Sequence, residues 1–304
     1  MGTPQFASNV LEGLISNGFN IVGVVSQPDK EVGRKKVLTP SPCKEVAIKH
    51  GIPVFQPSRI RNDYKDILDL KPELIITCAY GQIIPEEVLN YPKYHCINTH
   101  GSLLPIYRGG APIQRAIING DEYTGITLMY MSKGMDEGDI ITQKKLKIEI
   151  EDTNTDVFNK LSDLALAMLL ELDINNINAY PQDNSKATYA YNLSKEDEYI
   201  SFNENVYRVY NHIRGLLDNP GAYSILEGKK YKFHKVRFIK NNTNKPGCVI
   251  GMNDNALEIS CVDGSILVDI IQPEGKNIMN AKDFYNGIGK TLVGKVFENG
   301  PIKD

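Results

Sequence analysis

The first two-thirds of this 304-residue chain alternates short apolar runs with segments of helical spacing, and this alternation limits the fold more than any other feature. Three runs rich in Ile and Val have the length of a buried strand: residues 21–26, 74–79 and 96–100. Helical spacing occurs at residues 7–15, 44–49, 64–70 and 112–118. Strands that alternate with helices predict a doubly wound, mostly parallel sheet covered on both faces, the α/β class.

Two further strands, at residues 125–131 and 140–148, and a long helix at about 156–172 complete this half. The chain then becomes polar and loses its periodicity over residues 175–198. A short helix at about 204–216 precedes closely spaced strand candidates, at residues 223–226, 231–239, 247–252, 256–260 and 266–272. We therefore expect a first domain over residues 1–178, a linker over 179–198 and a smaller β-barrel of the OB type over 199–304.

The start of the chain departs from the doubly wound pattern. Met1-Gly2-Thr3-Pro4 leads straight into a helix, whereas such a domain normally begins with a strand that lies in the middle of the sheet. We therefore expect a first strand to be missing upstream of Met1, either by truncation or because the start is misassigned. A chain extended by a short apolar strand is expected to be more stable and more soluble.

The composition excludes several classes of protein. No apolar run reaches the length of about 18 residues that a membrane span needs, and no targeting segment is recognisable, so we expect a cytoplasmic protein. The five cysteines are scattered without the close spacing of a zinc site, which indicates reduced, structural thiols and no bound metal.

The net charge of −3 conceals two basic clusters. Arg34, Lys35 and Lys36 form the first, and residues 228–245 hold seven Lys and Arg, among them Lys229, Lys230 and Lys232, without an acid. Each cluster alone is typical of a solvated surface. Together they indicate a polyanionic partner such as a nucleic acid.

Candidate catalytic groups gather around one strand end. Asn98 and His100 stand two residues apart at the carboxyl end of a predicted strand, so both side chains point to one face at the sheet edge where α/β proteins bind ligands. Asp136 lies in a loop flanked by glycines that can bend toward them. An amide, an imidazole and a carboxylate suit acid–base catalysis with oxyanion stabilisation, although a hydrogen-bonded pair and a turn residue would look the same.

Two stretches, INTHGSLLPIYRGGAPIQRAIINGD at residues 97–121 and TGITLMYMSKGMDEGDII at residues 124–141, closely resemble the methionyl-tRNA formyltransferases. The resemblance extends to MGTPQFA, VVSQPDKEVGRKKVLTPSP, AYGQIIP, HIRGLLDNPGAY and TLVGK, and so covers essentially the whole chain. It implies a formyltransferase-like Rossmann domain followed by a tRNA-binding domain. The family usually has Trp where Phe202 and Asn219 stand, and this chain has no Trp, which raises a question about packing in the second domain.

The resemblance also implies an activity, in which the formyl group of 10-formyltetrahydrofolate passes to the amino group of initiator methionyl-tRNA for translation initiation. It places the catalytic trio on Asn98, His100 and Asp136. It places folate binding on Ser102, Leu103, Leu104 and Pro105, and contact with the tRNA acceptor arm on Arg34 with its neighbouring lysines. The implied enzyme needs no metal, and we expect it to act as a monomer.

Three other readings stay open. The formyl acceptor could be glycinamide ribonucleotide or a nucleotide-linked amino sugar. The chain could be a folate-binding or hydrolytic module that releases formate without tRNA. It could also be a pure RNA-binding protein, although that reading leaves the trio without a function.

Overall fold

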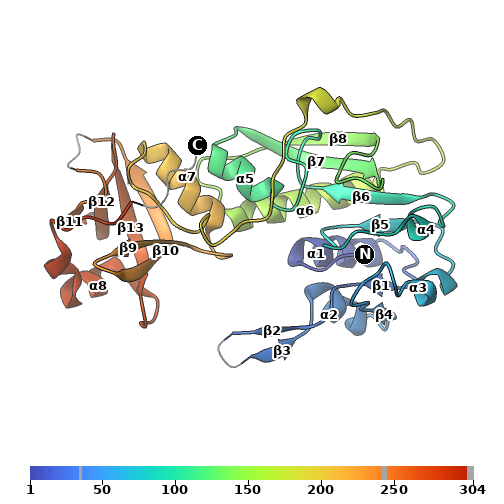
Figure 1. Cartoon of the computed structure of the whole chain (residues 1–304), viewed down its shortest axis with the longest axis horizontal. Coiled ribbons are helices and arrows are strands. Elements are labelled where there is room, and N and C mark those ends of the chain that lie inside the picture. Colours follow the sequence, from blue (N-terminus) through green and yellow to red (C-terminus); the bar gives the residue numbers. More distant parts are fainter. Residues whose placement is uncertain (34–35, 242–244, 300–304) are drawn as a thin grey trace. The chain divides into compact units, whose positions relative to one another are not determined.

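The computed structural model describes residues 1–33, 36–241 and 245–299, and within them the chain forms two compact units (Figure 1). The first unit combines Met1–Pro112, Tyr123–Lys147 and Phe158–Tyr191. The second combines Ile113–Glu122, Ile148–Val157 and the described residues from Asn192 onward. Each unit is therefore built from separate parts of the chain, and the basic residues Arg34 and Lys35 lie outside the described residues.

The sheet of the first unit contains four strands in the order β5-β6-β7-β8. β5 (Ile75–Thr77) and β6 (Cys96–His100) are parallel, whereas β7 (Tyr123–Tyr130) and β8 (Ile140–Lys147) are antiparallel to their neighbours. The expected parallel arrangement thus holds for β5 and β6 and does not extend to β7 and β8. The connection between β7 and β8, residues 131–139, is too short for the crossover that a parallel pair requires.

Met1 and Gly2 occupy the mid-sheet position expected for a first strand. The Gly2 N–H donates to the Val25 carbonyl at 2.9 Å, and the Cys78 N–H donates to the Met1 carbonyl at 2.9 Å. These bonds connect β1 (Val24–Val25), which pairs in parallel with β4 (Val54–Phe55), to the residues that follow β5. Met1 and Gly2 therefore lie between β1 and the residue that follows β5, and Pro4, the N-cap of helix α1, comes two residues after Gly2.

An apolar groove of about 460 Å³ continues from Met1 between these two strands. Residues 21–25 line one wall, and residues 74–76 with Cys78 line the other, while Leu14 of α1 and Ile67 of α3 lie along it. Val24 donates its N–H to Pro53, away from the groove, and Ile75 donates to His95 on the far side of β5. Because strand residues alternate direction, the N–H groups of Gly23 and Ile76 point into the groove.

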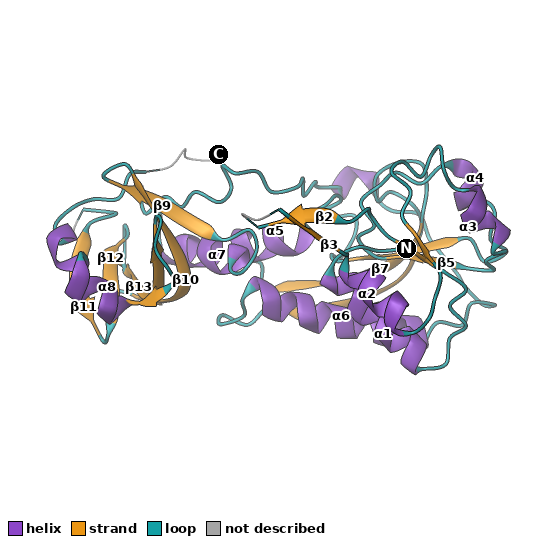
Figure 2. Ribbon diagram, turned by 90° about the horizontal axis from the view of Figure 1, so that it is seen from below, coloured by secondary structure: helices purple, strands orange, loops and turns teal. Residues whose placement is uncertain are grey.

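Helices cover both faces of this sheet, as the alternation predicts. α1 contacts α6 through the rings of Phe6 and Phe158, while Ile67 of α3 and Val88 of α4 belong to the core on the other face (Figure 2). A two-stranded hairpin of β2 and β3 stands apart from the sheet. The other elements that precede residue 192 in the sequence are α1 (Gln5–Ser16), β2 (Lys30–Val32), β3 (Val37–Thr39), α2 (Pro42–Lys49), α3 (Lys65–Asp69), α4 (Glu86–Leu89), α5 (Pro112–Asn119), α6 (Asn154–Leu170) and η1 (Asn184–Lys186).

The second unit contains an antiparallel sheet in the order β11-β12-β13-β10-β9, with β14 paired to β13. Alternating apolar residues of the strands face helix α7, whose N-cap Asn205 accepts a hydrogen bond from the Arg208 N–H. The elements are α7 (Val206–Leu216), β9 (Ala222–Leu226), β10 (Lys229–Ile239), β11 (Val249–Asn253), β12 (Ala256–Ser260), β13 (Ser265–Pro273), β14 (Met279–Asn280), α8 (Ala281–Gly287) and η2 (Gly289–Leu292).

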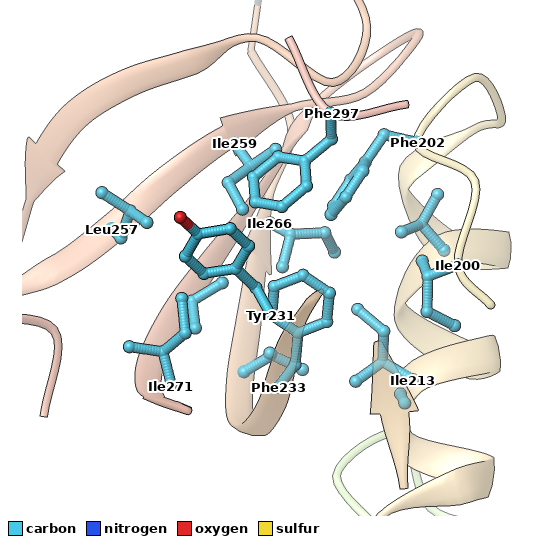
Figure 3. Packing of buried hydrophobic residues seen from close by; sticks show 14 of the residues in the cluster. Ile200, Phe202, Ile213, Tyr231, Phe233, Leu257, Ile259, Ile266, Ile271 and Phe297 are labelled. Atoms are coloured by element: carbon cyan, nitrogen blue, oxygen red, sulfur yellow. The ribbon is translucent and has the colours of Figure 1, made fainter. Parts of the chain in front are cut away.

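Aromatic rings fill the centre of the second unit (Figure 3). Phe202 is completely buried, and its ring centroid lies 5.8 Å from that of Phe233 and 5.3 Å from that of Phe297. The phenylalanine that stands at one of the family's tryptophan positions is therefore fully packed. Asn219, at the other position, is exposed and contributes its carbonyl oxygen to a hydrogen bond from Asn154.

The segment after η2 bridges the two edge strands of this sheet. The Val249 N–H of β11 donates to the Lys295 carbonyl at 2.9 Å, and the Gly294 N–H donates back to the Val249 carbonyl at 2.8 Å. Three residues after Lys295, the Glu298 N–H donates to the Ile225 carbonyl of β9 at 2.8 Å. The same short segment thus bonds to β11 at one edge and to β9 at the other.

Candidate active site

Asn98 and His100 lie at the carboxyl end of β6, which pairs with β5 on one side and β7 on the other. The Thr77 hydroxyl of β5 donates a hydrogen bond of 2.8 Å to Asn98 Oδ1. Since this contact uses the amide oxygen, the amide nitrogen Nδ2 faces Asp136, whose Oδ1 lies 3.4 Å away. The strand therefore presents an N–H donor to the site.

His100 is almost completely buried, with 5% of its surface exposed. Its Nε2 lies 2.8 Å from the Tyr107 carbonyl oxygen, and a carbonyl only accepts, so Nε2 carries hydrogen. Its Nδ1 lies 3.6 Å from Asp136 Oδ2. An acceptor oxygen thus faces each ring nitrogen, and the protonated imidazole can donate to both.

Asp136 completes the group although it is 36 residues from His100 in the sequence. Its Oδ2 accepts a hydrogen bond of 2.9 Å from the Gly109 N–H, and its backbone adopts a left-handed conformation with φ +50°. In the same loop, a Cβ on Gly138 would collide with the Tyr130 carbonyl oxygen, so glycine is required there. The structure therefore brings Asn98, His100 and Asp136 together, as the sequence predicts.

Sequence reasoning missed the residues that hold the Asp136 loop in place. Gln182 Nε2 donates to the Asp136 carbonyl at 2.8 Å and to the Gly138 carbonyl at 2.7 Å. Its Oε1 accepts from the buried Arg108 guanidinium, with Nη2 at 2.7 Å. Gln182 lies in the polar stretch that had no periodicity, and no local sequence signal marks it.

The same polar stretch pairs with the loop that follows β6. Arg108 donates its N–H to the Thr188 carbonyl at 2.8 Å, and the Ala190 N–H donates to the Arg108 carbonyl at 2.7 Å. Gly109 has φ +121°, and a Cβ there would lie 2.7 Å from the Ala190 oxygen. The loop that supplies Tyr107 and Gly109 to the site is thus fixed by residues about 80 positions away in the sequence.

The predicted folate stretch, residues 102–105, forms a compact turn. The Ser102 hydroxyl donates to the Ile106 carbonyl at 2.6 Å, and the Gln143 amide donates to the Leu104 carbonyl at 2.9 Å. Ser102 and Leu104 are buried, whereas Leu103 and Pro105 are partly exposed. Leu103 and Pro105 therefore have the side-chain surface available for a ligand.

A polar pocket of about 400 Å³ opens beyond the carboxyl ends of β1 and β5. Gln27, Arg59, Arg61 and Gln82 are among the residues that line it. β1, the Met1–Gly2 segment, β5 and β6 run parallel, so their carboxyl ends share one edge of the sheet. The pocket therefore lies on the same edge as the trio.

The predicted tRNA-binding lysines are exposed to different degrees. The Lys36 side chain is 78% exposed and lies 3.8 Å from Glu31. Lys229 is exposed at the start of β10, and Lys230 and Lys232 are partly exposed on the face opposite the core. Lys230 Nζ lies 3.7 Å from the centre of the Tyr223 ring, a cation–π contact.

Part of the positive charge of the second basic cluster is neutralised by acids in the folded chain. Arg237 forms ion pairs of 2.9 Å with Asp254 and with Asp269. Hydrogen bonds to Asp269 and Asp254 raise the pKa of the Arg237 guanidinium above its usual value. Acids from β13 and from the turn before β12 therefore pair with Arg237, although residues 228–245 themselves contain no acid.

All five cysteines are free thiols, and all but Cys248 are buried. Burial raises the pKa of the Cys43, Cys96 and Cys261 thiols to about 12. Within the described residues, no three His, Cys, Asp or Glu side chains gather as metal ligands would. None of the described helices has both the length and the apolar character of a membrane span.

Comparison with known proteins agrees with this arrangement. A formyl transferase family model matches residues 1–172, and a model of the formyl transferase C-terminal domain matches residues 192–289. The chain is therefore a formyl transferase. Within that class it belongs to the methionyl-tRNA formyltransferase family, since it is 45% identical to the enzyme of that name from Staphylococcus epidermidis over 97% of both chains.

Solved structures share the fold at lower identity. The methionyl-tRNA formyltransferase from Clostridium thermocellum has a TM-score of 0.56 at 20% identity, over 81% of this chain and 99% of that one. An N-formyltransferase from Helicobacter canadensis, in complex with folinic acid and dTDP-3-aminofucose, has a TM-score of 0.65 at 21% identity, over 88% and 96%. At these identities the likeness concerns the fold alone.

Proposed function

We propose that this enzyme transfers the formyl group of 10-formyltetrahydrofolate to the amino group of initiator methionyl-tRNA. The observation that carries the proposal is the convergence of Asn98, His100 and Asp136 at the end of β6. Membership of the methionyl-tRNA formyltransferase family supports the choice of substrates.

The reaction moves one formyl group and one proton. The methionyl amine attacks the formyl carbon, a new C–N bond forms, and the carbonyl oxygen becomes an oxyanion. When the bond to folate N10 breaks, N10 takes up the proton that the amine has lost. An enzyme for this transfer must therefore stabilise an oxyanion and carry a proton between two nitrogens.

The trio can supply both requirements. Asn98 Nδ2 has two N–H groups, and the one not directed at Asp136 is available to the oxyanion. His100, which is held through Nε2 by the Tyr107 carbonyl, carries the proton on Nδ1. Asp136 faces Nδ1 and stabilises the ring while it is charged.

Two features on the same edge of the sheet as the trio suit a folate. The partly exposed Leu103 and Pro105 offer apolar surface to a planar ring. Arg59 and Arg61 in the polar pocket suit the carboxylates at the other end of the folate. Folinic acid, a related folate, is bound in the Helicobacter canadensis N-formyltransferase structure.

In the second unit we propose an OB-like barrel that contacts the tRNA. Its support is the segment that bonds to β11 through Lys295 and to β9 through Glu298, which would close the sheet. Lys229, which is exposed at the start of β10, and Lys230 and Lys232 on its outer face would contact phosphates, as would Lys36 in the first unit.

Transfer of labelled formyl from 10-formyltetrahydrofolate to charged initiator tRNA tests the function. We expect labelled formylmethionine on that tRNA and much less on elongator methionyl-tRNA, which serves as the control. Formate release that does not depend on tRNA would indicate a hydrolase instead. Transfer to a nucleotide-linked amino sugar but not to tRNA would contradict the proposed acceptor.

A further inference from the structure

Two exposed tyrosines lie beside the loop that holds the imidazole. Tyr189 and Tyr191 are 51% and 65% exposed. Their rings are nearly parallel, with an angle of 8° between the planes and 5.8 Å between the centroids. The two aromatic side chains therefore stack on each other and together offer an aromatic surface to solvent.

The backbone between these rings is anchored to the catalytic loop. Tyr189 pairs with Arg108 in a parallel bridge, and the Ala190 N–H and carbonyl both bond to that loop, at Arg108 and Ala111. Because strand residues alternate, Ala190 turns inward and is completely buried while both tyrosines turn outward. The aromatic surface is thus held on a fixed backbone.

The backbone that carries this aromatic surface is paired with the loop that contacts His100 and Asp136. Arg108, the partner of Tyr189, directly follows Tyr107, whose carbonyl binds His100. It also directly precedes Gly109, whose N–H binds Asp136. A molecule that covers the tyrosines would therefore be a neighbour of the trio.

We propose that Tyr189 and Tyr191 form a stacking surface for a base of the single-stranded 3′ end of the acceptor tRNA. This inference rests on the proposed function. The amino acid is esterified to the terminal nucleotide, so an enzyme that formylates its amine must hold that nucleotide beside the trio. Every base offers a planar face to an aromatic ring, and such stacking needs no particular sequence.

The open position of the rings favours a base over the folate. Small cofactors are enclosed in concave pockets that bury most of their surface. Tyr189 and Tyr191 keep more than half of their surface exposed and enclose nothing by themselves. An exposed aromatic surface is instead typical of proteins that bind single strands.

The test compares three variants by steady-state kinetics. Replacing both tyrosines by Ala should raise the KM for methionyl-tRNA by about 5- to 150-fold, the range for the loss of one stacked base, and leave the KM for the folate unchanged. Replacing both by Phe keeps the rings and should keep the KM. Tyr180→Ala removes a tyrosine of similar exposure, 48%, from the same segment and should have no effect.

A second readout reports the stacking itself. An RNA hairpin with 2-aminopurine at its 3′ end should lose fluorescence when the wild-type enzyme or the Phe variant binds it, and should stay bright with the Ala variant. An unchanged KM for tRNA in a folded Ala variant would overturn the inference, and so would a rise in the folate KM instead. If the wild-type enzyme transfers no formyl to charged tRNA, the proposed function itself fails.

Discussion

The trio of the first unit and the aromatic core of the second unit hold their side chains by opposite means. Asp136 is kept in place by directed hydrogen bonds, from the Gly109 N–H to its carboxylate and from Gln182 to its carbonyl. Phe202 and Phe233 are kept in place by the packing of their rings against each other (Figure 3). Activity and stability therefore depend on different residues, so mutations should separate them.

Removing the imidazole should have the largest effect on activity. We expect His100→Ala to lower kcat by about 10²–10⁴-fold, because the proton carrier is lost, with little change in folate affinity. Single-turnover formyl transfer and calorimetric folate binding measure the two quantities. A variant that keeps near-normal turnover would exclude His100 from the chemistry.

Truncating a central ring of the second unit should lower stability and leave the kcat of the folded enzyme unchanged. Phe233→Ala is expected to lower the free energy of unfolding of the second unit by about 3–5 kcal/mol, because it leaves a cavity among Phe202 and Phe297. Denaturant titration followed by circular dichroism gives the change. Phe233→Leu, which fills more of the space, should cost less. A Phe233→Ala variant that stays fully folded but loses kcat would contradict the separation of activity from stability.

A change of charge without a change of size tests the carboxylate. Asp136→Asn should lower kcat by about 10²-fold, because an amide cannot stabilise the charged imidazole as a carboxylate does. The melting temperature should stay close to that of the wild type. A variant with normal kcat and a lower melting temperature would show that Asp136 serves only the turn.

The basic face of the second unit should show the smallest effect. Replacing Lys229, Lys230 and Lys232 by Ala should reduce the slope of log KM for tRNA against log salt by up to about 2–3, since each phosphate contact contributes about 0.7–0.9. The corresponding Arg variant keeps the charges and should keep the slope. If the Ala variant also keeps it, these lysines do not contact the tRNA.

Local patterns predicted the elements that carry the trio. The strand at residues 96–100 was predicted with its observed bounds, and the helices near residues 112–118 and 156–172 within two residues. Apolar periodicity suffices there because the elements are long or fully buried. β2, β3 and β4 were missed, since strands of two or three residues depend on their partners rather than on a pattern.

The support of the site could not be predicted from the sequence. Gln182 bonds to the Asp136 loop 46 positions earlier in the chain, and Thr188 bonds to the Tyr107 loop 81 positions earlier. Only the fold brings these residues together. The acids that pair with Arg237 could not be predicted for the same reason, because Asp254 comes from the turn before β12 and Asp269 from β13. Residue types in a sequence indicate which chemistry is possible. The tertiary contacts of each side chain then determine whether it is available for that chemistry.

The segment after η2 has a practical consequence for handling the protein. It bonds to β11 at Val249 and to β9 at Ile225, so one short stretch of chain protects two edge strands at once. An unprotected strand edge attracts a foreign strand. A protease cut between Lys295 and Glu298 should therefore release both edges together and promote aggregation.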